Sequence, residues 1–148
     1  MGTLPSKKSL ELQQYYGHPR NSFWKILFTL FNNTNASNYD IKKSLAIENN
    51  IAIWDVCYTA IRKDSLDSAI NEESPNRINE LIAGNPSIYT IVFNGQKAAH
   101  IYDKYFPKFE NINYLTLLST SPANAKFNFE DKLKNWSQIK QIIDSDES

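Results

Sequence analysis

Residues 88–105 read IYTIVFNGQKAAHIYDKY and change from a strand pattern to a helix pattern at one polar turn. The run Ile88–Phe93 is apolar and rich in β-branched and aromatic residues, which is typical of a buried strand. An Asn-Gly pair interrupts the run. From Gly95 to Tyr105 the apolar residues recur at the spacing of one helical face. The stretch therefore predicts a buried strand followed directly by an amphipathic helix.

The same alternation extends over the rest of the chain. Two further apolar runs, Ile51–Val56 and Ile112–Leu118, are expected to be buried strands. The other helices are predicted at Asn21–Asn32, Tyr39–Asn49, Pro75–Ala83 and Phe129–Ile143. The third of these is expected to start with a Ser-Pro cap and to end at Gly84. Strands that alternate with helices indicate an α/β fold with a parallel sheet covered on both faces. We expect one domain over residues 1–143 and an acidic tail over residues 144–148.

Composition excludes several function classes. The chain has 148 residues, of which 41% are hydrophobic, and its formal net charge is zero. The overall charge therefore does not indicate a nucleic-acid partner. A local basic patch remains an open alternative. A single cysteine excludes an intramolecular disulfide and a cysteine-ligated cluster. Two histidines without zinc spacing give no basis for a metal, and we expect no metal and no cofactor. Without a long apolar run or a secretory signal, we expect a cytoplasmic protein.

Three loops are expected at the ligand-binding edge of the sheet, beyond the carboxyl ends of the strands: Asp55–Thr59, Asn94–Gln96 and Ser119–Ala125. Small hydroxyl residues and a proline stiffen the last loop, so that it could approach a phosphate backbone closely. The alternative is a solvated loop that caps the next helix. Asn94 could read a base edge, because its amide donates and accepts, or it could be a helix N-cap.

The segment YYGHPRNSFW at residues 15–24 crowds aromatic and hydrogen-bonding side chains together. Tyr16 could stack on a planar base and Asn21 could orient a water. His18 could equally be a packed histidine, and Phe23 could be core. The GTLPS turn at residues 2–6 could expose backbone N–H groups to an anion, or it could be a loose terminus.

Five segments carry a resemblance to a known family. They are GTLPSKKSL (2–10), QQYYGHPRNSFWKIL (13–27), AIWDVCYTAIRKDSLDSAI (52–70), VFNGQKAA (92–99) and LLSTSPANA (117–125). In this order they resemble the uracil-DNA glycosylase superfamily, most closely its hypoxanthine-DNA (deoxyinosine) glycosylase branch. The YYGHPRNSFW segment is also similar to mismatch-specific uracil-DNA glycosylases. The resemblance implies a three-layer α/β/α sandwich with a central four-stranded parallel sheet. GTLPS would follow the first strand of that sheet, so either the fold begins with this loop or the first strand is missing at the N-terminus.

The resemblance also implies site residues. Asn21 would be catalytic, together with His18. The base pocket would be formed by Gly2, Thr3, Leu4, Pro5, Tyr16, Phe23 and Asn94. DNA would be bound by Ser6, Ser119, Thr120, Ser121, Pro122, Ala123 and Asn124. Uracil-specific branches carry a catalytic Asn or Asp where Leu4 stands, and often a His where Ser119 stands, so strong uracil activity is not expected.

The implied reaction is hydrolysis of the N-glycosidic bond of a deaminated base in DNA, most closely hypoxanthine in deoxyinosine. Such a base must be flipped out of the duplex, and the sugar gains oxocarbenium character as the bond breaks. No lysine nucleophile is indicated, so we expect a monofunctional enzyme that leaves an abasic site. We also expect the enzyme to be a monomer. Three alternatives stay open: uracil or a mismatched pyrimidine as substrate, a non-catalytic lesion-binding module, and a protein that binds free nucleotide or phosphate.

Overall fold

The computed structural model describes residues 1–2, 15–17, 19–31, 38–61, 72–75 and 77–147. Along the chain its elements are α2 (Phe23–Leu30), α3 (Tyr39–Glu48), β1 (Cys57–Ile61), β2 (Glu72–Pro75), α4 (Ile78–Gly84), β3 (Thr90–Asn94), α5 (Gln96–Tyr105), β4 (Asn113–Leu117) and α6 (Phe129–Glu147). The predicted helices are therefore present, with ends that differ by a few residues.

Strands β3 and β4 form a parallel pair, with α5 as the connection between them. Their register pairs Thr90 with Asn113 at one end and Asn94 with Leu117 at the other. The carboxyl ends of both strands consequently lie at the same edge of the sheet. The α/β fold with a parallel sheet is confirmed, and the loops after Asn94 and after Leu117 start side by side.

The number of strands differs from the prediction. Within the described residues the parallel sheet has the two strands β3 and β4, and Ile51–Val56 does not form the full-length strand that was predicted. Only Asp55 of that run makes an isolated parallel bridge, to Gly2. The apolar pattern of the run has another cause: Ile51 and Ile53 pack against one hydrophobic cluster and Val56 lies in another.

Residues Met1 and Gly2 lie between β3 and the Trp54–Val56 segment. The Asn94 N–H donates to the Met1 carbonyl at 2.7 Å, and the Met1 amino group donates to the Val92 carbonyl. On the other side, the Gly2 N–H donates to the Trp54 carbonyl at 3.2 Å and the Val56 N–H donates to the Gly2 carbonyl at 2.9 Å. Two residues thus bond to both neighbours in a parallel pattern.

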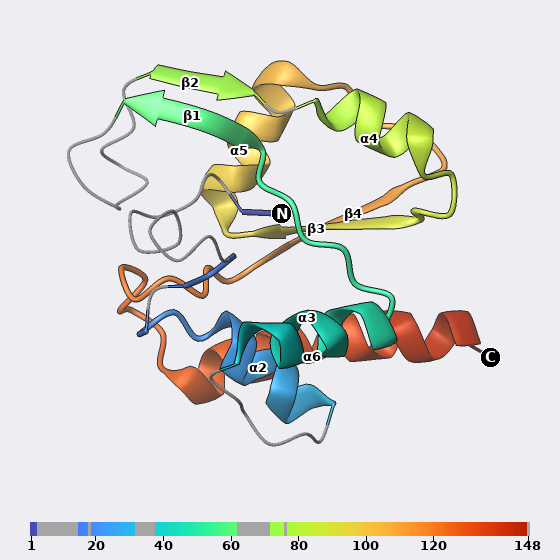
Figure 1. The fold of residues 1–148 in the computed structure, drawn as a ribbon. Helices are drawn as coiled ribbons and strands as arrows, with labels where there is room; N and C mark the ends of the chain where they lie inside the picture. The colour runs from blue at the N-terminus through green and yellow to red at the C-terminus, as the bar shows by residue number, and fades with distance from the viewer. Residues whose placement is uncertain (3–14, 18, 32–37, 62–71, 76, 148) are drawn as a thin grey trace.

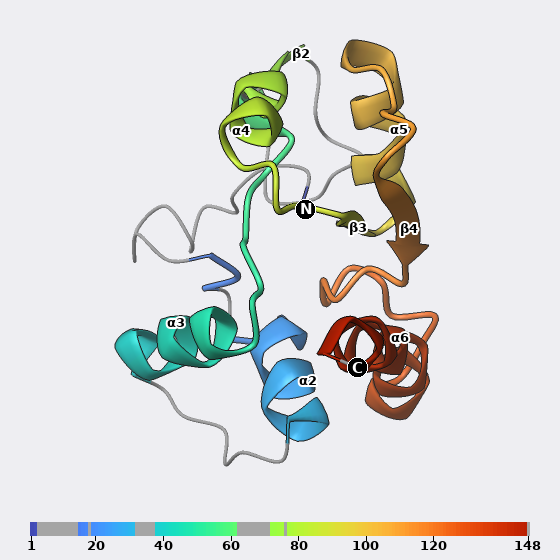
Figure 2. The same ribbon diagram turned by 90° about the vertical axis from the view of Figure 1, so that its right-hand side faces the viewer.

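Helices cover both faces of the sheet (Figures 1 and 2). Helices α2, α3 and α6 lie on one face, and α4 and α5 lie on the other. Successive β3 residues point to opposite faces, so that Val92 packs with the first group and Ile91 and Phe93 with the second. Each fully buried side chain of this size stabilises the fold by about 1.5–3 kcal/mol. Both clusters therefore stabilise the sheet, including the edge at which β3 and β4 end.

Strands β1 and β2 form an antiparallel hairpin, where a helix cap and part of a ligand-binding loop were predicted. It pairs Thr59 with Ser74 and Cys57 with Pro75. Because Ser74 and Pro75 belong to β2, they do not cap α4, which starts at Ile78. Cys57–Thr59 was expected in a ligand-binding loop and lies instead in β1. Gly84 is the last residue of α4, and Asn85 is its C-cap.

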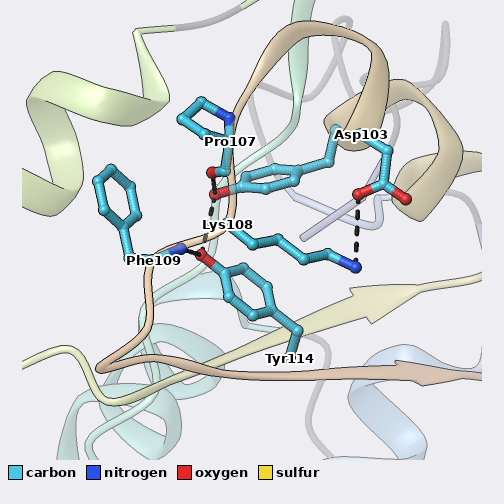
Figure 3. A network of polar contacts seen from close by, with 6 residues as sticks. Asp103, Pro107, Lys108, Phe109 and Tyr114 are labelled. Carbon is cyan, nitrogen blue, oxygen red and sulfur yellow. Dashed lines mark hydrogen bonds and ion pairs between the residues drawn. The ribbon is translucent and has the colours of Figure 1, made fainter.

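A partly buried tyrosine network lies at the end of the sheet opposite the carboxyl edge (Figure 3). The hydroxyl of Tyr102 lies 3.3 Å from that of Tyr114 and donates to the Pro107 carbonyl, also at 3.3 Å. The Phe109 N–H donates to the Tyr114 hydroxyl at 2.9 Å. Burial raises the pKa of Tyr102. The network anchors the segment between α5 and β4 and makes no contact with the Ser119 loop, which follows the other end of β4.

Candidate active site

Three polar side chains meet at the carboxyl edge of the sheet. Asn94 is the last residue of β3, Thr120 follows β4, and Asn21 precedes α2. The hydroxyl of Thr120 lies 2.8 Å from Asn21 Oδ1 and 2.8 Å from Asn94 Nδ2. The Thr120 N–H donates to Asn94 Oδ1 at 2.9 Å. Residues far apart in sequence are thereby joined in one continuous network.

Asn21 also shapes the start of α2. Its Oδ1 accepts the Phe23 N–H at 3.0 Å, which satisfies one of the donors that a helix N-terminus leaves unpaired. Ser22 adds two bonds to Thr120, since its N–H and its hydroxyl both lie near the Thr120 carbonyl, at 3.1 Å and 3.2 Å. The Asn21 side chain is half-buried. The segment before α2 is thus fastened to the loop after β4 by backbone and side chain alike.

Tyr16 lies between Gly2 and Phe23. Its backbone has φ of 54°, a left-handed conformation that is uncommon for a bulky residue. Its ring centroid is 4.1 Å from that of Phe23, with planes tilted by 33°. Such local strain persists only when the surroundings fix it, and it clusters at functional sites. Here it places the half-buried Tyr16 ring against Phe23.

Position 2 requires a glycine because neighbouring side chains lie very close to its backbone. A Cβ on Gly2 would lie 2.6 Å from Asp55 Oδ1 and 3.1 Å from the Tyr16 hydroxyl. Asp55 is 5% exposed, so this carboxylate cannot move aside at low cost. The charge of Asp55 also contributes to a raised pKa of Tyr15, for which burial is the larger cause. Gly2, Tyr16 and Asp55 therefore form one closely packed corner.

The Ser119–Asn124 loop is held by its own polar groups. The Asn124 N–H donates to the Ser121 carbonyl at 3.0 Å, and its side chain donates to the Ser119 carbonyl at 3.1 Å. Gly95, with φ of 97°, supports the loop from below, because a Cβ there would lie 3.0 Å from Ser119 Cβ. Ala123 is exposed and Pro122 is half-buried. These contacts fasten the loop to itself and to Gly95, in line with the stiff loop that its composition predicts.

Helix α6 supports the same loop. Asn128 and Asp131 cap its start reciprocally, with side chain to backbone distances of 2.9 Å and 3.2 Å. The buried Lys132 donates to the Ser121 carbonyl at 3.2 Å, and desolvation lowers the pKa of this lysine. Trp136 Nε1 donates to the Leu118 carbonyl at 2.7 Å. Lys132 was not among the predicted site residues, and its only sequence signal is its place one turn before Trp136 on the same helical face.

Three of the predicted site residues are buried. Thr120 is fully buried and its hydroxyl is bonded within the protein. Asn94 is 7% exposed, and its amide bonds to Thr120. Phe23 is 5% exposed and belongs to the core under Tyr16. Each side chain has the chemistry that was expected but serves to hold a neighbour.

The remaining predicted residues divide into two groups. Gly2, Tyr16 and Asn21 lie near this edge, and Ser119, Ser121, Pro122, Ala123 and Asn124 form the stiff loop. Thr3, Leu4, Pro5, Ser6 and His18 lie outside the described residues.

Two features of the described residues bear on the kind of site. Over these residues, His, Cys, Asp and Glu side chains do not gather in groups of three or more that could hold a metal. None of the described helices combines the length and apolar character needed to cross a membrane.

Comparisons with known proteins agree on one family. A model described as the uracil DNA glycosylase superfamily matches residues 1–140. A protein of Methanosarcina acetivorans named hypoxanthine DNA glycosylase is 34% identical over 142 residues, covering 94% of this chain and 87% of that protein. A protein of the same name from Methanosarcina barkeri is 31% identical, covering 93% and 86%.

A solved structure is similar over nearly the whole chain. It is a solution NMR structure from Methanosarcina acetivorans, described as a candidate uracil DNA glycosylase. The TM-score is 0.81 at 30% identity, covering 97% of this chain and 88% of the other.

Proposed function

Because the chain belongs to the uracil-DNA glycosylase superfamily, we propose that it is a DNA glycosylase that removes hypoxanthine from deoxyinosine. The observation that carries the proposal is the placement of Asn21 beside the sheet edge where ligands of parallel sheets bind. Two relatives named hypoxanthine DNA glycosylase, each matched over more than nine-tenths of this chain, support this choice of base.

The substrate is a nucleotide flipped out of DNA, because the glycosidic bond is inaccessible within the duplex. Tyr16 stacks on the flipped base, with Phe23 behind it as support. Gly2 lines the pocket floor, since its lack of a Cβ lets its backbone lie close against Tyr16 and Asp55. The family resemblance assigns Thr3, Leu4 and Pro5 to the base pocket and Ser6 to DNA binding. Ser119, Ser121, Pro122, Ala123 and Asn124 contact the phosphate backbone through the stiff loop.

Asn21 positions the attacking water, with assistance from His18. The bond between C1′ and the base nitrogen breaks, and its electron pair leaves with the base. The water oxygen bonds to C1′, one water proton is lost, and the departing base gains one proton. Charge develops chiefly on the sugar, so positioning and electrostatics contribute more than a strong base. The resemblance indicates no lysine nucleophile, so the product is an abasic site and the DNA strand is left intact.

We also infer that four parallel segments make the sheet, in the order Trp54–Val56, Met1–Gly2, β3 and β4. The backbone bonds on both sides of Met1 and Gly2 support this order. We further propose that residues 1–143 form one domain and that the protein acts as a monomer. Size-exclusion chromatography with light scattering, together with limited proteolysis, tests both points.

The function is tested with labelled duplexes that carry one deoxyinosine or one deoxyuridine, followed by alkali to cut at abasic sites. Scission at deoxyinosine that disappears in Asn21→Ala supports the proposal. Scission at deoxyuridine alone would keep the superfamily but overturn the hypoxanthine assignment. If a folded protein cut neither duplex, the chain would be a binding module instead, and a gel-shift assay with both duplexes would measure that binding.

A further inference from the structure

The orientation of two side-chain amides is fixed by backbone donors. The Phe23 N–H points at one end of the Asn21 amide, and the Thr120 N–H points at one end of the Asn94 amide. A backbone N–H can only donate, so each of these ends must be the carbonyl oxygen. The Nδ2 group of Asn94 is therefore the end that faces the Thr120 hydroxyl, at 2.8 Å.

The direction of the Thr120 hydroxyl follows from this. Asn94 Nδ2 can only donate, so Thr120 Oγ1 accepts from it. The other close partner of Oγ1 is Asn21 Oδ1 at 2.8 Å, which can only accept. The hydroxyl proton of Thr120 must then be directed at Asn21. Because Thr120 is fully buried, water does not compete for this bond.

The consequence concerns the reactive end of Asn21. Its Oδ1 accepts two hydrogen bonds, from Phe23 N–H and from Thr120, and so both lone pairs are used. The described residues supply no acceptor for its Nδ2. Since Oδ1 faces buried Thr120, Nδ2 is directed away from it on a side chain that is only half-buried.

We propose that Thr120 is a positioning residue that acts through Asn21, locking its carboxamide so that the N–H₂ group, rather than the carbonyl oxygen, is offered to the reacting atoms. This inference rests on the proposed glycosylase function. Asn94 completes the lock by holding the Thr120 oxygen from the other side.

An amide fixed this way recognises a hydrogen-bond acceptor. In hydrolysis of the glycosidic bond, that acceptor is either the oxygen of the attacking water or an acceptor atom of the departing base. Asn21 therefore does not withdraw a proton from water; it places the water or stabilises the leaving base as electron density moves onto it.

The test measures single-turnover excision of hypoxanthine by Thr120→Val and Thr120→Ser. Thr120→Val keeps the shape but lacks the hydroxyl, and Thr120→Ser keeps the hydroxyl. We expect Thr120→Val to lower the excision rate constant by about 10- to 100-fold with little change in DNA affinity. We expect Thr120→Ser to restore most of the rate. Equal rates for Thr120→Val and the unmodified protein would overturn the proposal.

A matched control separates positioning from general destabilisation. Tyr114→Phe also removes a hydroxyl that accepts an N–H, in this case the backbone N–H of Phe109 at the opposite end of the sheet. Assayed well below its unfolding temperature, it should retain the rate of the unmodified protein. If it lost as much activity as Thr120→Val, the effect of Thr120 would be one of stability, and the proposal would fail.

The double variant shows whether Thr120 acts through Asn21. Adding Thr120→Val to Asn21→Ala should lower the rate no further, because the positioned group is already gone. A full additional loss would assign Thr120 a role independent of Asn21 and overturn the proposal.

NMR keeps this inference separable from the function. The side-chain NH₂ resonances of Asn21 and Asn94 should shift in Thr120→Val and stay close to their original positions in Thr120→Ser, in DNA-free protein. If these shifts occurred without any deoxyinosine excision, the lock would stand and the proposed function would fail. If excision occurred without the shifts, the lock would fail and the function would stand.

The source of the acceptor is decided by comparing bases. The loss of rate in Asn21→Ala is measured on deoxyinosine and on any second base that the protein excises. An equal loss on both bases assigns Nδ2 to the water, and a loss that depends on the base assigns it to the leaving group.

Discussion

The Thr120 hydroxyl lies 2.8 Å from the Oδ1 of Asn21, a residue 99 positions earlier in the chain. This contact joins the loop after β4 to the segment before α2. It places a buried hydroxyl directly behind the side chain that we propose to be catalytic. Stability and activity are therefore linked at this position.

Thr120→Val should lower the free energy of unfolding by about 1–3 kcal/mol, because it leaves the buried Asn94 N–H without its acceptor. Urea unfolding at neutral pH measures the change. Thr120→Ser should lose much less. A Thr120→Val protein as stable as the unmodified chain would mean that the buried bond contributes nothing.

Gly2→Ala should destabilise the protein by about 1–3 kcal/mol, since the added methyl group would overlap the Asp55 carboxylate. Gly84→Ala is the matched control. It introduces the same methyl group at the end of α4, where nothing lies within 4 Å. Thermal unfolding should show a clear decrease for the first variant and none for the second. Equal melting temperatures would contradict the close packing around Gly2.

Tyr16→Ala should weaken binding and excision of the flipped base by about 1–3 kcal/mol, the value of one aromatic stacking contact. Tyr16→Phe keeps the ring against Phe23 and should retain most of the rate. Single-turnover excision and affinity for a duplex with a deoxyinosine measure both variants. If Tyr16→Ala were fully active, the ring would be part of the core only.

Stability should fall in alkali. Burial raises the pKa of Tyr102 and of Tyr15 above the ordinary value of 10.0. Below pH 10 both tyrosines are neutral whether the protein is folded or unfolded, and stability is unaffected. Above pH 10 they ionise first in the unfolded chain, which favours unfolding.

Tyr102→Phe removes one of these two ionisations. The free energy of unfolding, measured with urea between about pH 9 and about pH 11, should therefore fall less steeply in this variant. Identical slopes for the unmodified protein and Tyr102→Phe would show that Tyr102 is not held in its neutral form.

Much of the fold was predictable because its signals are local. β3 and β4 are short β-branched and aromatic runs that end at polar residues, and α6 has its capping pair in the sequence. The β1–β2 hairpin was not predictable. Its second strand, Glu72–Pro75, is polar and ends in proline, and it becomes a strand only through pairing with β1.

The location of the site was predictable from the sequence, but the contacts within the site were not. The order of strands and helices brings Asn21, Asn94 and the Ser119–Asn124 loop to one edge. The order of strands and helices does not show which of the hydroxyl residues Ser119, Thr120 and Ser121 is buried, because all three have the same chemistry. Only the packing of α2 and β3 against the loop turns Thr120 inward and makes it fully buried.

The central claim is that this chain excises hypoxanthine and that Asn21 acts in the reaction as a donor. Asn21→Asp tests it most directly, because a carboxylate keeps both accepted bonds but has no N–H to offer. The measurement is the single-turnover rate of deoxyinosine excision at neutral pH by the unmodified protein, Asn21→Asp and Asn21→Ala. We predict excision by the unmodified protein and an Asn21→Asp rate as low as that of Asn21→Ala. An Asn21→Asp protein that is as active as the unmodified one would contradict the donor role, and an unmodified protein that leaves deoxyinosine intact would contradict the function.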